Sequence, residues 1–121
     1  VGSAATGNRI EGNYIGSDRT GLSDRGNTAN GILIDNSSQT TIGSSGSGRN
    51  VIVSNGQNGI LLTNVGANLT TIQANYVGIG AVGKMALGNT ADGIAIENAP
   101  CNLIGGTTDD LANLILANKQ N

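Results

Sequence analysis

The sequence predicts an all-β protein, a parallel β-helix (solenoid) of about four coils, each with three short strands around an aliphatic core with asparagine ladders. A pattern of glycine, three mostly apolar residues, a polar residue and asparagine occurs at residues 31–36, 59–64 and 93–98. A shift of 62 residues aligns 8–49 with 70–111, with identity at 15 of 42 positions, most of them Gly, Asn or Ile. Such internal periodicity is typical of solenoids, in which each coil packs on its neighbours.

Composition favours the same fold. The chain has 20 Gly and 17 Asn, but no Trp, Phe or His and only two Tyr. The core must therefore be built from Ile, Val, Leu and Ala, which suits a narrow stack of aliphatic layers. Gly and Asn both tolerate left-handed backbone, so their abundance indicates many tight corners. Disorder, the other interpretation of a Gly- and Asn-rich chain, disagrees with the regular spacing of the apolar residues.

The expected elements follow in chain order. Residues 1–7 are a fraying end or the tail of a preceding coil, 9–11 form a short strand, and 12–16 turn. A polar loop at 17–26 and a corner at 26–31 come next. The three coils that follow are expected to have strands at 32–34, 42 and 50–53, then at 60–62, 71–73 and 84–87, and finally at 94–96, 102–104 and 113–116.

The coils differ in length, since the glycine-isoleucine copies start 28 and then 34 residues apart. The longer coil carries an inserted loop at 78–88, which repeat symmetry pairs with the loop at 16–26. An amphipathic helix over residues 109–119 is the alternative for the last strand. The repeat favours a strand there, because 50–52 and 113–115 correspond.

Stacking predicts which side chains align. Strand side chains alternate between faces, and adjacent strands lie about 4.8 Å apart. Three inward ladders are expected at Ile32/Ile60/Ile94, Ile34/Leu62/Ile96 and Ile42/Ile72/Ile104. Two asparagine columns are expected at corners: Asn36/Asn64/Asn98 and Asn27/Asn55/Asn89.

The chain is expected to be a single β-helix domain over residues 1–121, with a long repeat of 8–69 and 70–121. It stops where the next glycine-isoleucine strand is due, which predicts a fragment of a longer solenoid. The formal net charge is −2 and the Lys and Arg are spread along the chain, so no nucleic-acid stripe is expected. No apolar run is long enough to span a membrane.

Residue inventory limits the chemistry. Without His, a Ser-His-Asp or Cys-His site cannot form. The single Cys101 rules out an intramolecular disulfide. No cofactor and no metal are expected.

Several runs resemble bacterial right-handed parallel β-helix repeats, which share their fold with pectate lyases: residues 12–16, 26–32, 41–43 and 49–52. The resemblance covers about residues 8–118, and right-handedness follows from it and from the general crossover preference. It implies a secreted or cell-surface protein, but no activity, because such proteins include lyases, glycoside hydrolases, tailspikes and adhesins.

Candidate site residues lie on outward positions. Asp35 and Glu97 are candidate catalytic carboxylates, expected about 9–10 Å apart across two coils, near the upper limit of the spacing in inverting glycosidases. Leu33 and Leu61 form a candidate apolar contact strip. Tyr14 and Tyr76, which precede the two loops, are candidates for stacking on sugar rings.

The function expected is that of a non-catalytic extracellular or cell-surface scaffold or adhesion segment. Its candidate partners are carbohydrate and neighbouring solenoid coils, through end-to-end or edge self-association. The alternative is a polysaccharide lyase or glycoside hydrolase of the pectate-lyase-like fold, or a fragment of one.

Overall fold

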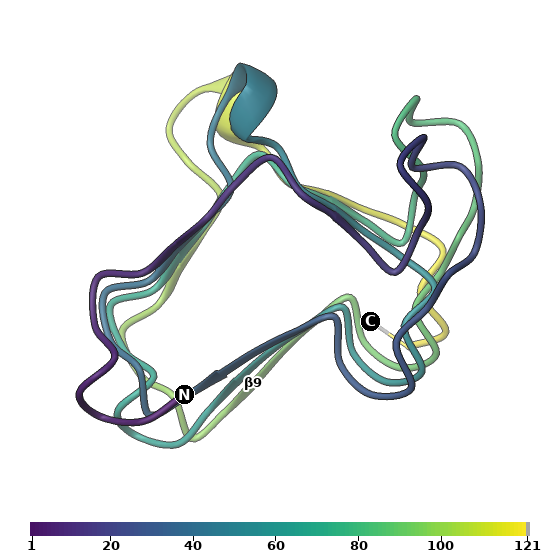
Figure 1. Ribbon diagram of the computed structural model, residues 1–121. Helices are drawn as coiled ribbons and strands as arrows, with labels where there is room; N and C mark the ends of the chain where they lie inside the picture. Colours follow the sequence, from purple (N-terminus) through teal and green to yellow (C-terminus); the bar gives the residue numbers. More distant parts are fainter. Residues whose placement is uncertain (121) are drawn as a thin grey trace.

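The computed structural model describes residues 1–120 and shows a parallel β-solenoid whose successive coils overlap when viewed along the axis (Figure 1). Three parallel sheets line it. Sheet I has the order β1-β4-β7-β10, sheet II the order β2-β5-β8-β11 and sheet III the order β3-β6-β9. The strands are β1 (Arg9–Ile10), β2 (Tyr14–Ile15), β3 (Ile32–Asp35), β4 (Thr41–Ile42), β5 (Val51–Ile52), β6 (Ile60–Thr63), β7 (Thr71–Ile72), β8 (Tyr76–Val77), β9 (Ile94–Glu97), β10 (Leu103–Ile104) and β11 (Leu114–Ile115).

The stack has about three coils, so the prediction of about four is wrong. Coils begin at β3, β6 and β9, and each then adds one strand to sheet I and one to sheet II. Residues 1–31 contribute only β1 and β2 to a partial coil. Residues 2–7 are nonetheless ordered on the stack, because the Gly2 and Gly7 amides donate to the Asp35 and Ser38 carbonyls.

The aliphatic ladders are confirmed in register. Ile32, Ile60 and Ile94 pair across sheet III, as do Ile34, Leu62 and Ile96. Sheet I aligns Ile10, Ile42, Ile72 and Ile104. The central members are fully buried, and burying one such side chain stabilises the fold by roughly 1.5–3 kcal/mol.

The third strand of each coil differs from the prediction in two places. Residues 12–16 were expected to turn, yet Tyr14–Ile15 forms β2 and pairs with β5. Residues 84–87 were expected to form the third strand of the second coil, but that strand is β8, Tyr76–Val77. Residues 84–87 lie instead in the inserted loop, where Ile79 and Ala86 form an antiparallel bridge. The shared feature is an asparagine directly before each strand of sheet II, at positions 13, 50, 75 and 113.

These four asparagines form a ladder that the sequence analysis missed. The backbone amide and Nδ2 of each donate to Oδ1 of the next: Asn13 to Asn50, Asn50 to Asn75, and Asn75 to Asn113, over 2.9–3.3 Å. Nδ2 also donates to a carbonyl of the preceding coil, as from Asn75 to Ile42 at 2.8 Å. Each internal side chain therefore ties three successive coils.

The second ladder is the predicted column Asn27/Asn55/Asn89, continued by Asn118. The same donor pattern runs in the same direction, with Nδ2 to Oδ1 distances of 2.8–2.9 Å. A third, shorter set of asparagine bonds runs in the opposite direction. The backbone amide and Nδ2 of Asn58 donate to Oδ1 of Asn30, in the preceding coil.

Asn36, Asn64 and Asn98 fall at one corner, as predicted, but the predicted bonds between their side-chain amides are not observed. These residues occupy left-handed backbone with φ of 52°, 69° and 53°, a conformation that asparagine tolerates better than most residues. Among residues 1–120 their side chains do not bond to one another. Nδ2 of Asn64 donates to Asp35, and Oδ1 of Asn36 accepts from the Gly66 amide of the next coil at 3.2 Å. Their role is to turn the corner after sheet III.

The alternative of a helix over 109–119 is not observed. The segment forms a single 3-10 turn, η2 (Asp109–Leu111), followed by β11, and η1 (Gly46–Gly48) lies at the same corner of an earlier coil. No helix in the described part of the chain is long and apolar enough to cross a membrane.

Asn75→Ala tests the ladder. We expect a loss of at least about 2 kcal/mol in the free energy of unfolding, because Asn75 is fully buried and the change leaves buried donors of Asn50 unpaired. Chemical denaturation measures the loss. The control is Asn8→Ala, since Asn8 is exposed and its side chain bonds only to the nearby Ala5 carbonyl. Equal effects of the two changes would contradict the role of the ladder.

Candidate functional site

The outer face of sheet III carries four of the predicted site residues. Leu33 is 43 % exposed and pairs with the half-buried Leu61, so the apolar strip exists but is narrow. Asp35 and Glu97 lie in one outward column with Thr63 between them. Two strand spacings of about 4.8 Å separate the carboxylate positions by about 9.6 Å, at the upper limit of the roughly 6.5–9.5 Å of inverting glycosidases. The fold places the two acids in line but does not bring them together.

The outer face of sheet II brings the two tyrosines into one column. Tyr14 pairs with Val51, Val51 with Tyr76 and Tyr76 with Leu114. Tyr14 is 47 % exposed, whereas Tyr76 is half-buried. The tyrosines therefore lie two coils apart, with Val51 as the floor between them.

Arg49 adds a cation to this face. Its guanidinium lies 4.3 Å from the centre of the Tyr76 ring, and its Nε donates to the Ala74 carbonyl at 3.1 Å. These two contacts hold the side chain flat on the sheet. Its other N–H donors have no acceptor among residues 1–120, so they remain available to a ligand.

Two matching loops bound one side of the face. Each loop contains one antiparallel bridge: Ser17 pairs with Asp24 in residues 16–26, and Ile79 pairs with Ala86 in residues 78–88. They lie side by side, since the Ala81 amide donates to the Gly21 carbonyl at 3.0 Å. The predicted placement of both loops on one side of the stack is confirmed. In Figure 1, both loops project outward at one end of sheet II, and η1 projects outward at its other end.

A cavity of about 210 Å³ lies between these borders. Its lining combines an aromatic ring, a guanidinium and small residues: Gly12, Tyr14, Gly46, Ser47, Arg49, Val51 and Ala81. Pockets that enclose a drug-sized ligand span roughly 300–1,000 Å³, so this one suits a single ring of a longer chain. We call the cavity together with the exposed Tyr14 ring the Tyr14 groove.

Sequence reasoning missed Arg49. It lies two residues before Val51, and alternation along a strand puts both on the outer face. This alternation could have identified Arg49 from the sequence, but only if β5 had been recognised as the strand that pairs with β2, which contains Tyr14. No group of three His, Cys, Asp or Glu that could hold a metal ion occurs within residues 1–120.

Comparison of the chain with protein-family models, with curated proteins and with solved structures gave no match. The structure therefore establishes a parallel β-solenoid, and the resemblance to pectate-lyase-like proteins remains a prediction.

Asp18 should make the stability of the loop beside the groove depend on pH. A hydrogen bond from the Thr20 hydroxyl, at 2.6 Å, is the main cause that lowers the pKa of Asp18 below 3.8, and backbone amides of Thr20 and Leu22 add to it. Because the folded pKa is lowered, the loop is stabilised above pH 3.8 and loses this contribution as pH falls through the lower value. An NMR titration of the Asp18 carboxyl group measures it. In Thr20→Val the pKa should move back toward 3.8, and a wild-type value at or above 3.8 would refute the assignment.

Proposed function

We propose that this chain is a non-catalytic β-solenoid segment of a secreted or cell-surface protein, and that it binds carbohydrate along the outer face of sheet II. The observation that supports the proposal is the exposed Tyr14 ring beside the free guanidinium donors of Arg49, over a cavity of about 210 Å³. The proposed role is adhesion to, or display on, a glycan surface.

The chemistry of the groove fits a sugar. A tyrosine ring offers a flat apolar face and a polar hydroxyl, which match the two kinds of surface on a pyranose ring. The guanidinium supplies several directed donors for hydroxyl or carboxylate oxygens. Because Arg49 is the only cation lining the cavity, the proposal favours glycans that carry carboxylates, such as uronic acids.

The scaffold fits this role as well. Parallel sheets present outward side chains at a repeat of about 4.8 Å, so a linear polymer can lie along the stack. Tyr14 and Tyr76 differ in exposure, which makes Tyr14 the ring that contributes most to binding.

Tyr14→Ala tests the proposal. A glycan array on the purified chain identifies a ligand, and titration calorimetry then measures its affinity. We expect about a tenfold loss, which corresponds to about 1.4 kcal/mol, because the stacking ring is removed. Tyr14→Phe should keep most of the affinity, and Leu33→Ala on sheet III should keep all of it. An array without a bound glycan, or an unchanged affinity of Tyr14→Ala, would disprove carbohydrate binding at this groove.

The same purified chain separates binding from catalysis. Incubation with pectin, alginate and glycosaminoglycans should give no new products. Products that appear with the wild type and disappear with Asp35→Asn would refute the non-catalytic part of the proposal and support a polysaccharide-active enzyme.

A further inference from the structure

The outer face of sheet II repeats every two coils. One outward column alternates between an aromatic and an aliphatic side chain: Tyr14, Val51, Tyr76 and Leu114. A strand spacing of about 4.8 Å places Tyr14 and Tyr76 two coils, or about 9.6 Å, apart. A ligand that lies along the axis therefore meets the same kind of surface at every second coil.

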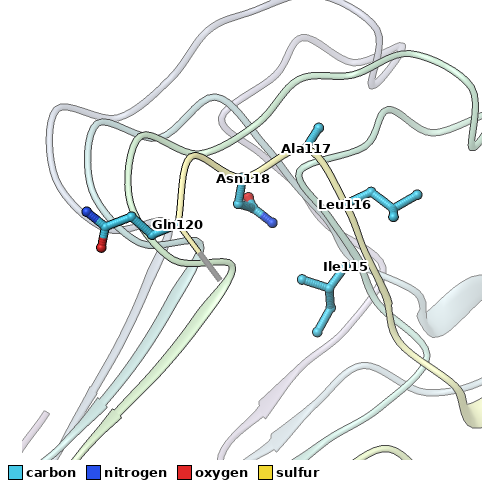
Figure 2. Close-up of a pocket in the computed structure, with 5 residues that line it drawn as sticks. All are labelled: Ile115, Leu116, Ala117, Asn118 and Gln120. Atoms are coloured by element: carbon cyan, nitrogen blue, oxygen red, sulfur yellow. The ribbon is translucent and has the colours of Figure 1, made fainter.

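The neighbouring outward column alternates in the same way. Its members are glycine in one coil and an apolar residue in the next: Gly16, Val53, Gly78 and Leu116. Figure 2 shows Ile115 and Leu116 on opposite sides of the chain, so Leu116 is outward where Ile115 is inward. The two glycines have φ of 84° and 85° and begin the inserted loops, so a loop leaves sheet II at every second coil.

The borders of this face also alternate. The inserted loops follow β2 and β8, whereas the 3-10 turns η1 and η2 precede β5 and β11. Only three residues lead into β2 and into β8, at 11–13 and 73–75, but longer segments lead into β5 and β11, at 43–50 and 105–113. Each coil thus raises a wall at one edge of sheet II, and the next coil raises it at the other edge (Figure 1).

An extended β-linked polysaccharide has a matching symmetry. Its successive pyranose rings are turned over relative to each other, so their larger substituents alternate between the two sides of the chain. Two such rings span about the length of two strand spacings. On sheet II the edge without a wall alternates as well, so each ring can direct its larger substituents away from the wall of its own coil.

Charge restricts the polymer further. Arg49 is the only cation that lines the Tyr14 groove, and the equivalent residue before β11 is Ala112. At the same edge, η2 carries Asp109 and Asp110. A polymer with a carboxylate on every ring would bring several negative charges to one guanidinium and set others against these acids. One carboxylate for every two rings avoids this repulsion.

We propose that the ligand of the Tyr14 groove is an extended, β-linked polysaccharide whose repeat is one acidic and one neutral sugar, and that it lies parallel to the solenoid axis with one disaccharide on every two coils. This rests on the proposed function, carbohydrate binding at sheet II, and names the class of glycan. The acidic ring lies over β8, where its carboxylate accepts from the terminal nitrogens of Arg49, which is held over Tyr76. The neutral ring occupies the cavity above Val51, and the next acidic ring stacks on Tyr14.

Four tetrasaccharides separate these claims in titration calorimetry. They are a hyaluronan fragment, which alternates glucuronate and N-acetylglucosamine, a β-linked mannuronate, the neutral chitotetraose and an α-linked galacturonate. We expect the hyaluronan fragment to bind at least about tenfold more tightly than each of the others. Equal binding by any of the other three would overturn the inference.

The same measurement distinguishes failure of the inference from failure of the proposed function. A glycan that binds at the groove while the hyaluronan fragment does not would overturn only the class proposed here. No binding of any glycan, on the array or in calorimetry, would refute carbohydrate binding itself and the inference with it.

Arg49→Gln tests the position of the acidic ring. The variant should lose the preference for the hyaluronan fragment over chitotetraose and bind chitotetraose as the wild type does. The matched control is Arg9→Gln, because Arg9 is an exposed cation on the outer face of sheet I, paired with Glu11, and its loss should leave all four affinities unchanged. An equal loss for both glycans in Arg49→Gln would contradict a charge contact with the acidic ring.

A nitroxide on the reducing end of the hyaluronan fragment tests the direction of the chain. A ligand along the axis should broaden the NMR signals of β2 or of β11 and spare the loop residues on either side, such as Val82 and Ser45. Broadening at Val82 or Ser45 instead would show a ligand that crosses the sheet, and would overturn the axial placement.

Discussion

Each internal asparagine of the two ladders ties three successive coils, because its side-chain oxygen accepts from the asparagine of the coil before and its amide donates to the side-chain oxygen of the coil after. The side chains of Asn50, Asn55, Asn75 and Asn89 are fully buried, where an unpaired amide would cost roughly 1–3 kcal/mol. A shift of one coil relative to the next would break these bonds together. The ladders therefore fix the register in which the aliphatic side chains stack.

This fixed register explains how the chain accommodates insertions. The loops at 16–26 and 78–88 leave the stack after sheet II and return before the second ladder, at Asn27 and Asn89. Because the asparagine at the return point restores the alignment, residues can be added between without disturbing the core. The same arrangement builds the Tyr14 groove, since the loops rise beside a flat outward column. The interior is thus occupied by stacked side chains, whereas the corners and outward positions can vary between coils.

Much of the interior was predictable from the sequence, whereas the outer groove was not. Ile32, Ile60 and Ile94 repeat in a pattern that alternation and periodicity identify directly. Two-residue strands such as β2 and β8 contain too few residues for alternation, so Tyr14 was assigned to a turn and residues 84–87 to a strand. Asn36 and Asn55 are the same residue type at different corners, and only backbone geometry distinguishes a left-handed turn from a ladder amide. Arg49 reaches Tyr76 across coils, a contact that depends on register and side-chain length together.

Hydrogen exchange of the asparagine side-chain amides, followed by NMR, tests the central claim most directly. The account predicts slow exchange for the Nδ2 protons of Asn50, Asn75 and Asn89, which are buried and bonded to neighbouring coils. Asn8, which is exposed and bonds only locally, should exchange rapidly. Rapid exchange of all four side chains at similar rates would contradict the ladders and, with them, the stacked register of the solenoid.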